Sequence, residues 1–232
     1  MFNPEKPPGL QVEKWVNTKS PLTLEMLRGR VVVVLAFQML CPGCVSHALP
    51  QAKKLTERFN FAEVAVIGLH TVFEHHDAMT VAALEAFVHE YRWPFPIAAD
   101  KPNGHGLPVT MEAYEMRGTP TLLLFDRQGR LRRHYLGQVD DIRLASEIMC
   151  LAIEAPDATR DASIAIERTM AAVLIDPQAE AHVHGPGCNH DHGHDDGHDH
   201  HHEHGPDCGH SHDHASAAAA KKPAEKSSKS KR

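Results

Sequence analysis

Three uninterrupted hydrophobic runs dominate the pattern of apolar and polar positions along the chain. They cover residues 31–37 (VVVVLAF), 64–70 (VAVIGLH) and 121–125 (TLLLF). Runs of β-branched residues without polar alternation are typical of strands that are covered on both faces. The three runs therefore predict buried strands in the interior of one sheet.

The segments between these runs carry apolar residues at helical spacing. They predict helices over residues 45–59, 80–92, 110–116 and 140–154, with a weaker helix over 157–175. Shorter strands are expected at 94–99 and 131–136, and the second follows the turn Asp126-Arg127-Gln128-Gly129. This order of elements predicts an α/β sandwich with a mixed central sheet and helices on both faces.

The two ends of the chain lack this patterning. Three prolines and a glycine in the first nine residues predict an irregular N-terminal arm. Near the C-terminus the apolar content is too low to offset the entropy of ordering, so a tail that is disordered without metal is expected. The expected organisation is an arm at 1–20, the α/β domain at 21–155, an extra helix or linker at 156–178, a His-rich tail at 179–214 and a basic tail at 215–232.

Charge and hydropathy restrict the class of protein. The chain has 232 residues and a formal net charge of −6, which argues against general nucleic-acid binding because basic patches attract the phosphate backbone. The N-terminus lacks a signal-peptide pattern, and the run at 31–37 is far too short to span a bilayer. We therefore expect a soluble, cytoplasmic protein with neither nucleic acid nor membrane as a partner.

A Cys-x-x-Cys motif, Cys41-Pro42-Gly43-Cys44, joins the first buried run to the predicted helix at 45–59. In a reducing cytosol such a pair is more often catalytic or metal-binding than a structural disulfide. The unpaired N–H groups and dipole of a helix N-terminus stabilise a thiolate on Cys41. Cys44 is then placed to attack a mixed disulfide at Cys41 and release the partner. The motif predicts a redox-active dithiol.

A second motif, Gly118-Thr119-Pro120-Thr121, stands directly before the third buried run. Together with the strand-CxxC-helix arrangement, it resembles the thioredoxin-like redoxin superfamily. The most similar branch contains alkyl hydroperoxide reductase/thiol-specific antioxidant proteins and TlpA-like disulfide reductases. The resemblance implies a thioredoxin-like three-layer sandwich over roughly residues 10–155. It also implies that Pro120 is cis and faces the CxxC motif, and that Thr119 lends backbone groups to a bound disulfide substrate.

The motif departs from thioredoxin in ways that affect its chemistry. Leu40 stands where thioredoxins have Trp, and Pro42-Gly43 replaces Gly-Pro, so the substrate range and reduction potential of thioredoxin do not carry over. No carboxylate interrupts residues 31–34, so the buried proton-transfer acid of thioredoxin is missing. His47, one turn beyond Cys44, is a candidate proton acceptor, and a solvated helix histidine is the alternative. Residues 74–76 (Glu-His-His) are further candidates to line the site.

A thiol peroxidase is an alternative function. Peroxiredoxins carry the pattern P-x-x-x-T-x-x-C. With Cys44 as the peroxidatic cysteine, Phe37 and Cys41 occupy the Pro and Thr positions. With Cys41 in that role, Val34 and Gln38 occupy them. Neither alignment keeps the pattern.

Thirteen of the twenty histidines lie in residues 182–214, a stretch with seven acids and no Lys or Arg. The pattern H-G-P-x-C-x-H-x-H occurs there twice, beginning at His184 and at His204. Imidazole and thiolate are ligands that Zn, Ni, Co and Cu favour, and the tail resembles the His-rich extensions of nickel and zinc chaperones. We expect a metal-binding tail whose affinity falls below about pH 6, and a low-complexity solubility tail is the alternative. The candidate ligands are His182, His184, Cys188, His190, His192, His194, His198, His200, His201, His202, His204, Cys208, His210, His212 and His214.

The sequence thus predicts a thiol-disulfide oxidoreductase with a metal-binding tail. Its expected substrate is a disulfide-containing protein or a small thiol or peroxide, and no catalytic cofactor is expected besides the redox-active disulfide. The expected catalytic set is Cys41, Cys44, Thr119, Pro120 and His47. Two alternatives remain: a peroxiredoxin-type antioxidant enzyme, and a non-enzymatic metal storage or chaperone protein in which the two cysteines bind Zn.

Overall fold

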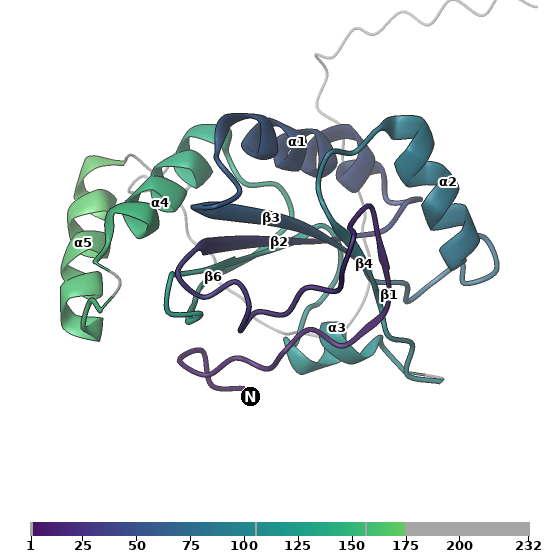
Figure 1. The fold of residues 1–232 in the computed structure, drawn as a ribbon, viewed down its shortest axis with the longest axis horizontal. Helices are drawn as coiled ribbons and strands as arrows, with labels where there is room; N and C mark the ends of the chain where they lie inside the picture. The colour runs from purple at the N-terminus through teal and green to yellow at the C-terminus, as the bar shows by residue number, and fades with distance from the viewer. Residues whose placement is uncertain (1, 105, 156, 175–232) are drawn as a thin grey trace, which may run out of the picture. The chain divides into compact units, whose positions relative to one another are not determined.

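The computed structural model describes residues 2–104, 106–155 and 157–174. Over these residues the core is a six-stranded sheet with the order β1-β4-β3-β2-β5-β6 (Figure 1). The strands are β1 (Val12–Val16), β2 (Val31–Phe37), β3 (Val64–His70), β4 (Ile97–Asp100), β5 (Thr121–Phe125) and β6 (Leu131–Leu136). The central strands β2, β3 and β4 are parallel, whereas β1, β5 and β6 each pair antiparallel with a neighbour. The sheet is mixed, as predicted.

The two central strands form because their side chains are apolar on both sides. Every residue of β2 and β3 is buried, and the strands pair in register from Val31↔Val64 to Phe37↔His70. Successive side chains of a strand point to opposite faces, so the same seven residues supply two hydrophobic cores. Val33 packs in one core and Val34 in the other. The predicted two-sided burial is confirmed.

Helices cover both faces of the sheet (Figure 1). They are η1 (Cys44–Ala48), α1 (Leu49–Arg58), α2 (Val81–Tyr91), α3 (Val109–Ala113), α4 (Asp141–Ile153) and α5 (Arg160–Val173). Apolar side chains of α1, α2 and α4 contribute to one core, and Met111 of α3 contributes to the other. The structure therefore has the predicted α/β sandwich architecture, and η1 is a π-helical turn that continues directly into α1.

The prediction of an irregular arm at 1–20 is wrong for its second half. There β1 pairs antiparallel with β4, from Val12↔Asp100 to Val16↔Ile97. Its sequence, VEKWV, is only half-buried at best and lacks a clear alternation, because it is an edge strand. The strand is stabilised by a partner far along the chain, which a local pattern does not reveal.

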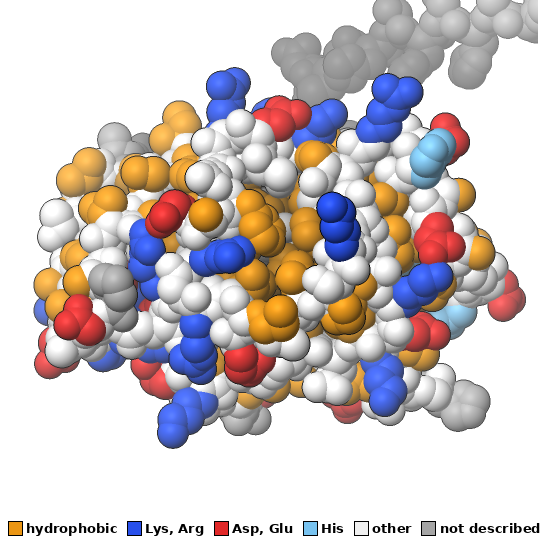
Figure 2. Space-filling model, viewed as in Figure 1, with side chains coloured by type: hydrophobic (Ala, Val, Ile, Leu, Met, Phe, Trp, Pro, Cys, Tyr) orange, Lys and Arg blue, Asp and Glu red, His pale blue; other side chains and the backbone are white. Residues whose placement is uncertain are grey.

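Figure 2 shows Lys and Arg side chains intermixed with Asp and Glu over the face viewed, around hydrophobic side chains at its centre. Among the described helices, none has the length and apolar character needed to cross a membrane.

Candidate active site

The CxxC motif lies in the turn that follows the carboxyl end of β2. Three backbone hydrogen bonds fix this turn. The Cys41 N–H donates to the Gln38 carbonyl at 3.2 Å, and the N–H groups of Cys44 and Val45 both donate to the Cys41 carbonyl at 3.1 Å. The π-helical turn η1 begins at Cys44, and such turns are frequent at functional sites. The two cysteines are therefore held at the start of a helix, as predicted.

The two sulfur atoms have different surroundings. Cys41 is half-buried, and its thiol donates to the Thr119 carbonyl at a sulfur–oxygen distance of 3.5 Å. The Cys44 N–H donates to the Cys41 Sγ at a nitrogen–sulfur distance of 3.3 Å. Cys44 itself is fully buried. Both are free thiols in this structure, so the site holds one accessible thiol and one enclosed thiol.

The enclosed thiol holds its proton strongly. Burial raises the pKa of the Cys44 thiol to about 12, and the hydrogen bond with the Cys41 thiol adds to the shift. A buried thiolate lacks the hydration that stabilises its charge, so the neutral form is favoured. When both cysteines are reduced, Cys44 is therefore protonated at neutral pH.

The predicted partner segment lies against the dithiol. The Thr119–Pro120 peptide bond is cis, as expected. A Cβ placed on Gly43 would be 3.7 Å from the Pro120 Cδ, so the ring lies close to the middle of the motif. The Pro120 carbonyl accepts a hydrogen bond from the Gly137 N–H at 2.8 Å, which fixes the segment to the residue after β6. The structure thus brings Cys41, Cys44, Thr119 and Pro120 together.

A cavity of about 310 Å³ opens beside Pro120. Ser46, His47 and Lys54 from η1 and α1 line it, and so do Gln138, Asp140 and Asp141 from the segment between β6 and the start of α4. This volume is at the lower end of the range typical of small-molecule sites. His47 therefore lies on the wall of a cavity that also contains Pro120. Sequence reasoning missed this cavity because its walls come from segments far apart in the chain.

His47 is exposed, and its ring is hydrogen-bonded to a neighbour. The Ser46 Oγ lies 2.6 Å from the His47 Nδ1 and 2.7 Å from the Pro42 carbonyl oxygen. Residues 74–76, the other candidates, are exposed in the loop after β3 and do not line the cavity beside Pro120. Of these sequence candidates, His47 therefore lines the cavity beside Pro120, and residues 74–76 do not.

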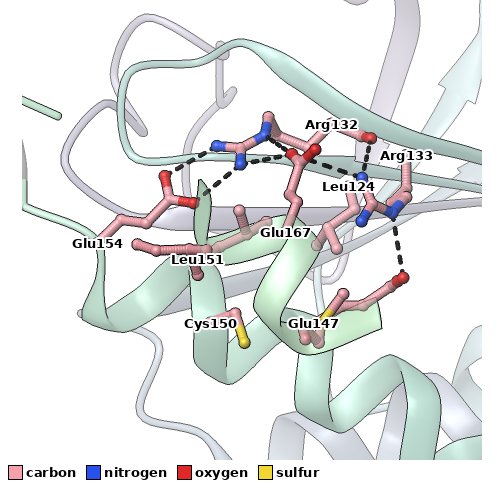
Figure 3. Close-up of a pocket in the computed structure, with 10 residues that line it drawn as sticks. Leu124, Arg132, Arg133, Glu147, Cys150, Leu151, Glu154 and Glu167 are labelled. Atoms are coloured by element: carbon pink, nitrogen blue, oxygen red, sulfur yellow. Dashed lines mark hydrogen bonds and ion pairs between the residues drawn. The ribbon is translucent and has the colours of Figure 1, made fainter. Parts of the chain in front are cut away.

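A second, much smaller cavity of about 10 Å³ lies between β6, α4 and α5. Figure 3 shows Cys150 and Leu151 on one side of it and the charged groups of Arg132, Glu154 and Glu167 on the other. It shares no lining residue with the cavity beside Pro120. Its volume is about that of one water molecule, so it is a gap in the packing rather than a substrate site.

The predicted metal ligands at 182–214 lie outside the described residues. Within the part of the chain that the structure describes, no group of three or more His, Cys, Asp or Glu side chains could hold a metal ion. The dithiol region therefore provides at most two of the four ligands that a structural zinc site needs.

The sequence of this chain matches a known protein family. The model of the AhpC/TSA family matches residues 6–134. No curated protein sequence matches the chain.

Several solved structures are similar in fold. One is a thioredoxin-like superfamily protein with 54% sequence identity and a TM-score of 0.64, covering 65% of this chain and 97% of its own. Another is a thiol-disulfide isomerase from Corynebacterium glutamicum with 48% identity and a TM-score of 0.63, covering 65% of this chain and 98% of its own. A thioredoxin-like protein solved in the oxidised form has 21% identity and a TM-score of 0.52, covering 62% of this chain and 91% of its own.

Proposed function

The chain belongs to the AhpC/TSA family and has a thioredoxin-like fold, and on this premise we propose that it is a thiol-disulfide oxidoreductase whose redox centre is the Cys41-Pro42-Gly43-Cys44 dithiol. One observation carries the proposal. A half-exposed sulfur at Cys41 lies against the Thr119 carbonyl, while the sulfur of Cys44 is fully enclosed behind it. This asymmetry suits an attacking thiol and a resolving thiol.

The reaction proceeds in two exchanges. The Cys41 thiolate attacks one sulfur of a substrate disulfide, the substrate S–S bond breaks, and the other substrate sulfur leaves as a thiolate. Cys44 then gives up its proton to solvent and attacks the Cys41 sulfur, the bond between Cys41 and the substrate breaks, and the second substrate thiolate leaves and takes up a proton from solvent. A Cys41–Cys44 disulfide remains. When Cys41 is bonded to substrate, its thiol no longer donates to the Thr119 carbonyl. That carbonyl then becomes available to a substrate backbone N–H.

The surroundings of the dithiol favour a polypeptide substrate. Leu40 precedes Cys41 and is 56% exposed, and Leu136, which is 57% exposed, lies near the Gly118 backbone. We propose that these two apolar side chains contact a polypeptide substrate. The similar protein from Corynebacterium glutamicum is named a thiol-disulfide isomerase, which supports the same reaction class.

Two serine substitutions test the assignment. We expect Cys41→Ser to abolish reduction of insulin disulfides, because the attacking sulfur is gone. We expect Cys44→Ser to accumulate a mixed disulfide with the substrate, detectable by mass spectrometry, because the resolving thiol is absent. Cys150→Ser is the matched control and should retain full activity, since Cys150 lies in α4 and does not line the cavity beside Pro120. Full activity of Cys41→Ser would refute the proposal.

A thiol peroxidase is the second candidate. Gln38 occupies the peroxiredoxin Thr position when Cys41 is the nucleophile, and its buried Nε2 has no hydrogen-bond partner among the described residues. A stopped-flow titration of the reduced protein with hydrogen peroxide separates the two functions. We expect peroxide consumption to be much slower than disulfide exchange, whereas fast consumption would assign the protein to the peroxidases.

We also propose that residues 182–214 bind Zn, Ni, Co or Cu through imidazole and thiolate groups. The duplicated H-G-P-x-C-x-H-x-H pattern supports this proposal.

A further inference from the structure

The hydrogen bonds of Ser46 define which nitrogen of His47 carries a proton. The Ser46 hydroxyl has a single hydrogen, and its contact with the Pro42 carbonyl at 2.7 Å requires that hydrogen because a carbonyl only accepts. The contact of 2.6 Å between the Ser46 Oγ and the His47 Nδ1 is therefore a bond in which Nδ1–H donates to the hydroxyl oxygen. In the neutral ring, the Nε2 is then left as the unprotonated nitrogen.

The other nitrogen of the ring is available for chemistry. The Nε2 of His47 has no hydrogen-bond partner among the described residues, and the residue is exposed on the wall of the cavity beside Pro120. The imidazole thus has one nitrogen anchored to the helix and one exposed. This arrangement resembles a positioned acid–base group more than a freely rotating surface histidine.

The remaining ionisable groups that line this cavity are already engaged. Lys54 and Asp141 form an ion pair at 3.0 Å, and Asp141 also accepts a hydrogen bond from Gln51 at 2.7 Å. Asp140 accepts the N–H groups of Ile142 and Arg143 at 3.0 Å each, as the N-cap of α4. His47 is therefore the proton donor or acceptor that a molecule in this cavity would meet.

We propose that His47 is the general acid that protonates the thiolate leaving from a substrate disulfide, and that Ser46 is the positioning residue that fixes its ring. The inference rests on the proposed exchange at Cys41. Thr119 contacts the Cys41 sulfur, and the adjoining Pro120 lines the cavity together with His47. The proposal therefore places the leaving sulfur of a disulfide attacked at Cys41 in this cavity.

Electrons and protons are conserved in this exchange. The Cys41 thiolate forms a bond to one substrate sulfur, and the electron pair of the substrate S–S bond goes to the departing sulfur. That thiolate takes the proton from the Nε2 of the His47 imidazolium. Solvent supplied this proton to the ring beforehand. The products are a mixed disulfide at Cys41, a substrate thiol and a neutral imidazole. Its remaining proton stays on Nδ1, in the hydrogen bond to Ser46 that the structure shows.

General acid catalysis matters most when the leaving group is basic, which provides a direct test. Hydroxyethyl disulfide releases a basic alkanethiolate, whereas dithiodipyridine releases an acidic thiol that departs readily without protonation. Single-turnover stopped-flow rates of the reduced full-length protein are measured with both. We expect His47→Ala to slow the reaction with hydroxyethyl disulfide by about tenfold or more and to leave the reaction with dithiodipyridine unchanged.

Ser46 is tested in the same assay. Ser46→Ala should slow only the hydroxyethyl disulfide reaction, by less than His47→Ala, and Ser46→Thr should restore the rate because it keeps the hydroxyl. Ser146→Ala is the matched control, since the Ser146 hydroxyl makes the same type of bond to the Ile142 carbonyl in α4. His89→Ala, which removes an exposed histidine of α2, is the control for His47. Neither control should change either rate.

The pH dependence provides a readout that a structural role would not change. The ratio of the two rates, alkyl over pyridyl, cancels the ionisation of Cys41. In the wild type this ratio should depend on pH, because the general acid must carry a proton on Nε2, and in His47→Ala it should stay flat. Lys54, Asp140 and Asp141 are the other charged groups that line the cavity.

The outcomes separate this inference from the proposed function. Equal slowing of both substrates by His47→Ala, or no change with either, would overturn the general-acid role. A Ser46→Ala variant that matches Ser146→Ala would overturn the positioning role. Loss of both reactions in Cys41→Ser would leave the proposed function standing in either case, whereas activity in that variant would remove the proposed function itself.

Discussion

His70 is a buried histidine with an unusual environment at the end of β3. Its ring centroid lies 5.3 Å from that of Phe37, the residue is 2% exposed, and its Nε2 has no hydrogen-bond partner among the described residues. Burial lowers its pKa to about 4 from the usual 6.5, because the low-polarity surroundings disfavour the imidazolium. The folded protein therefore holds this imidazole in its neutral form at neutral pH.

This burial makes folding stability dependent on pH. The unfolded chain binds a proton at His70 near pH 6.5, whereas the folded chain binds it only near pH 4. Stability from this group is therefore complete above pH 6.5 and is lost as the pH falls towards 4. Between about pH 7 and about pH 5 we expect a loss of about 2 kcal/mol in the free energy of unfolding.

Urea unfolding of the wild type and of His70→Gln at these two pH values measures the effect. The amide of Gln does not titrate, so the variant should lose less stability than the wild type on acidification. Equal losses in the two proteins would show that His70 does not contribute to the pH dependence of stability.

The high pKa of Cys44 makes the second exchange sensitive to pH. Burial raises the pKa of Cys44, and Cys44 remains buried behind Cys41 when Cys41 is bonded to substrate. Its thiolate fraction therefore rises with pH, so the mixed disulfide should resolve faster at higher pH. We expect its lifetime to shorten by up to about tenfold per pH unit. Acid quenching followed by mass spectrometry measures that lifetime. A lifetime that does not change between about pH 6 and about pH 8 would contradict the expectation.

At the residue scale, the sequence predicted the motifs but not their environment. Cys41 and Cys44 were recognisable from their spacing, and Thr119 and Pro120 from their place before a buried strand. The hydrogen bond between Ser46 and His47 was not predictable, because it depends on the side-chain rotamers of an individual turn. The neutral state of His70 was also not predicted, because the run at 64–70 indicates a buried strand but not that the ring Nε2 lacks a hydrogen-bond partner among the described residues.

At the element scale, α5 is attached to the sheet by a cluster of charges rather than by an apolar stripe (Figure 3). The Arg132 side chain of β6 is 1% exposed and lies within 3.0 Å of carboxylate oxygens of Asp126, Glu154 and Glu167. Asp126 and Glu154 are also buried, whereas Glu167 comes from α5 and is 23% exposed. The guanidinium neutralises two enclosed carboxylates and holds the helix through a third.

Removal of the Arg132 guanidinium should therefore lower the free energy of unfolding much more than removal of the Glu167 carboxylate. Arg132→Ala leaves Glu154 buried without its main counter-charge and leaves Asp126 with Arg130 as its remaining ion-pair partner. We expect a loss of about 3–5 kcal/mol in the free energy of unfolding. Glu167→Gln removes one partly exposed partner and should cost about 1 kcal/mol or less. Urea unfolding measures both, and similar losses for the two variants would contradict this account of the cluster.

The elements that depend on their own sequence were predictable, whereas those that depend on distant partners were not. The strands β2, β3 and β5 have two buried faces, which an apolar run shows directly. The strand β1 depends on pairing with β4, and its sequence alone gave no sign of this. The docking of α5 was equally hidden, because its pattern left open whether it packs on the domain, and the ion pairs that settle this join residues distant in sequence.

At the scale of the whole molecule, the described residues and the His-rich tail are expected to have separate chemistry. The described residues offer no cluster of three or more metal ligands, so metal binding should depend on residues 182–214. Isothermal calorimetry with Zn²⁺ should show binding to the full chain and none to a chain ending at residue 178. Affinity should fall below about pH 6, where imidazoles gain protons. Undiminished binding by the shortened chain would refute the proposal.

The same arginine that holds α5 also has a consequence for association between copies of the protein. The strands β1 and β6 are the two edges of the described sheet, and free edges are templates for pairing with strands of other chains. Inward-pointing charge and bulges are devices that prevent such pairing. Arg132 supplies buried charge at one edge, and β1 has an irregularity between Val12 and Lys14 at the other. We therefore expect the charge cluster under α5 to disfavour aggregation through this edge of the sheet.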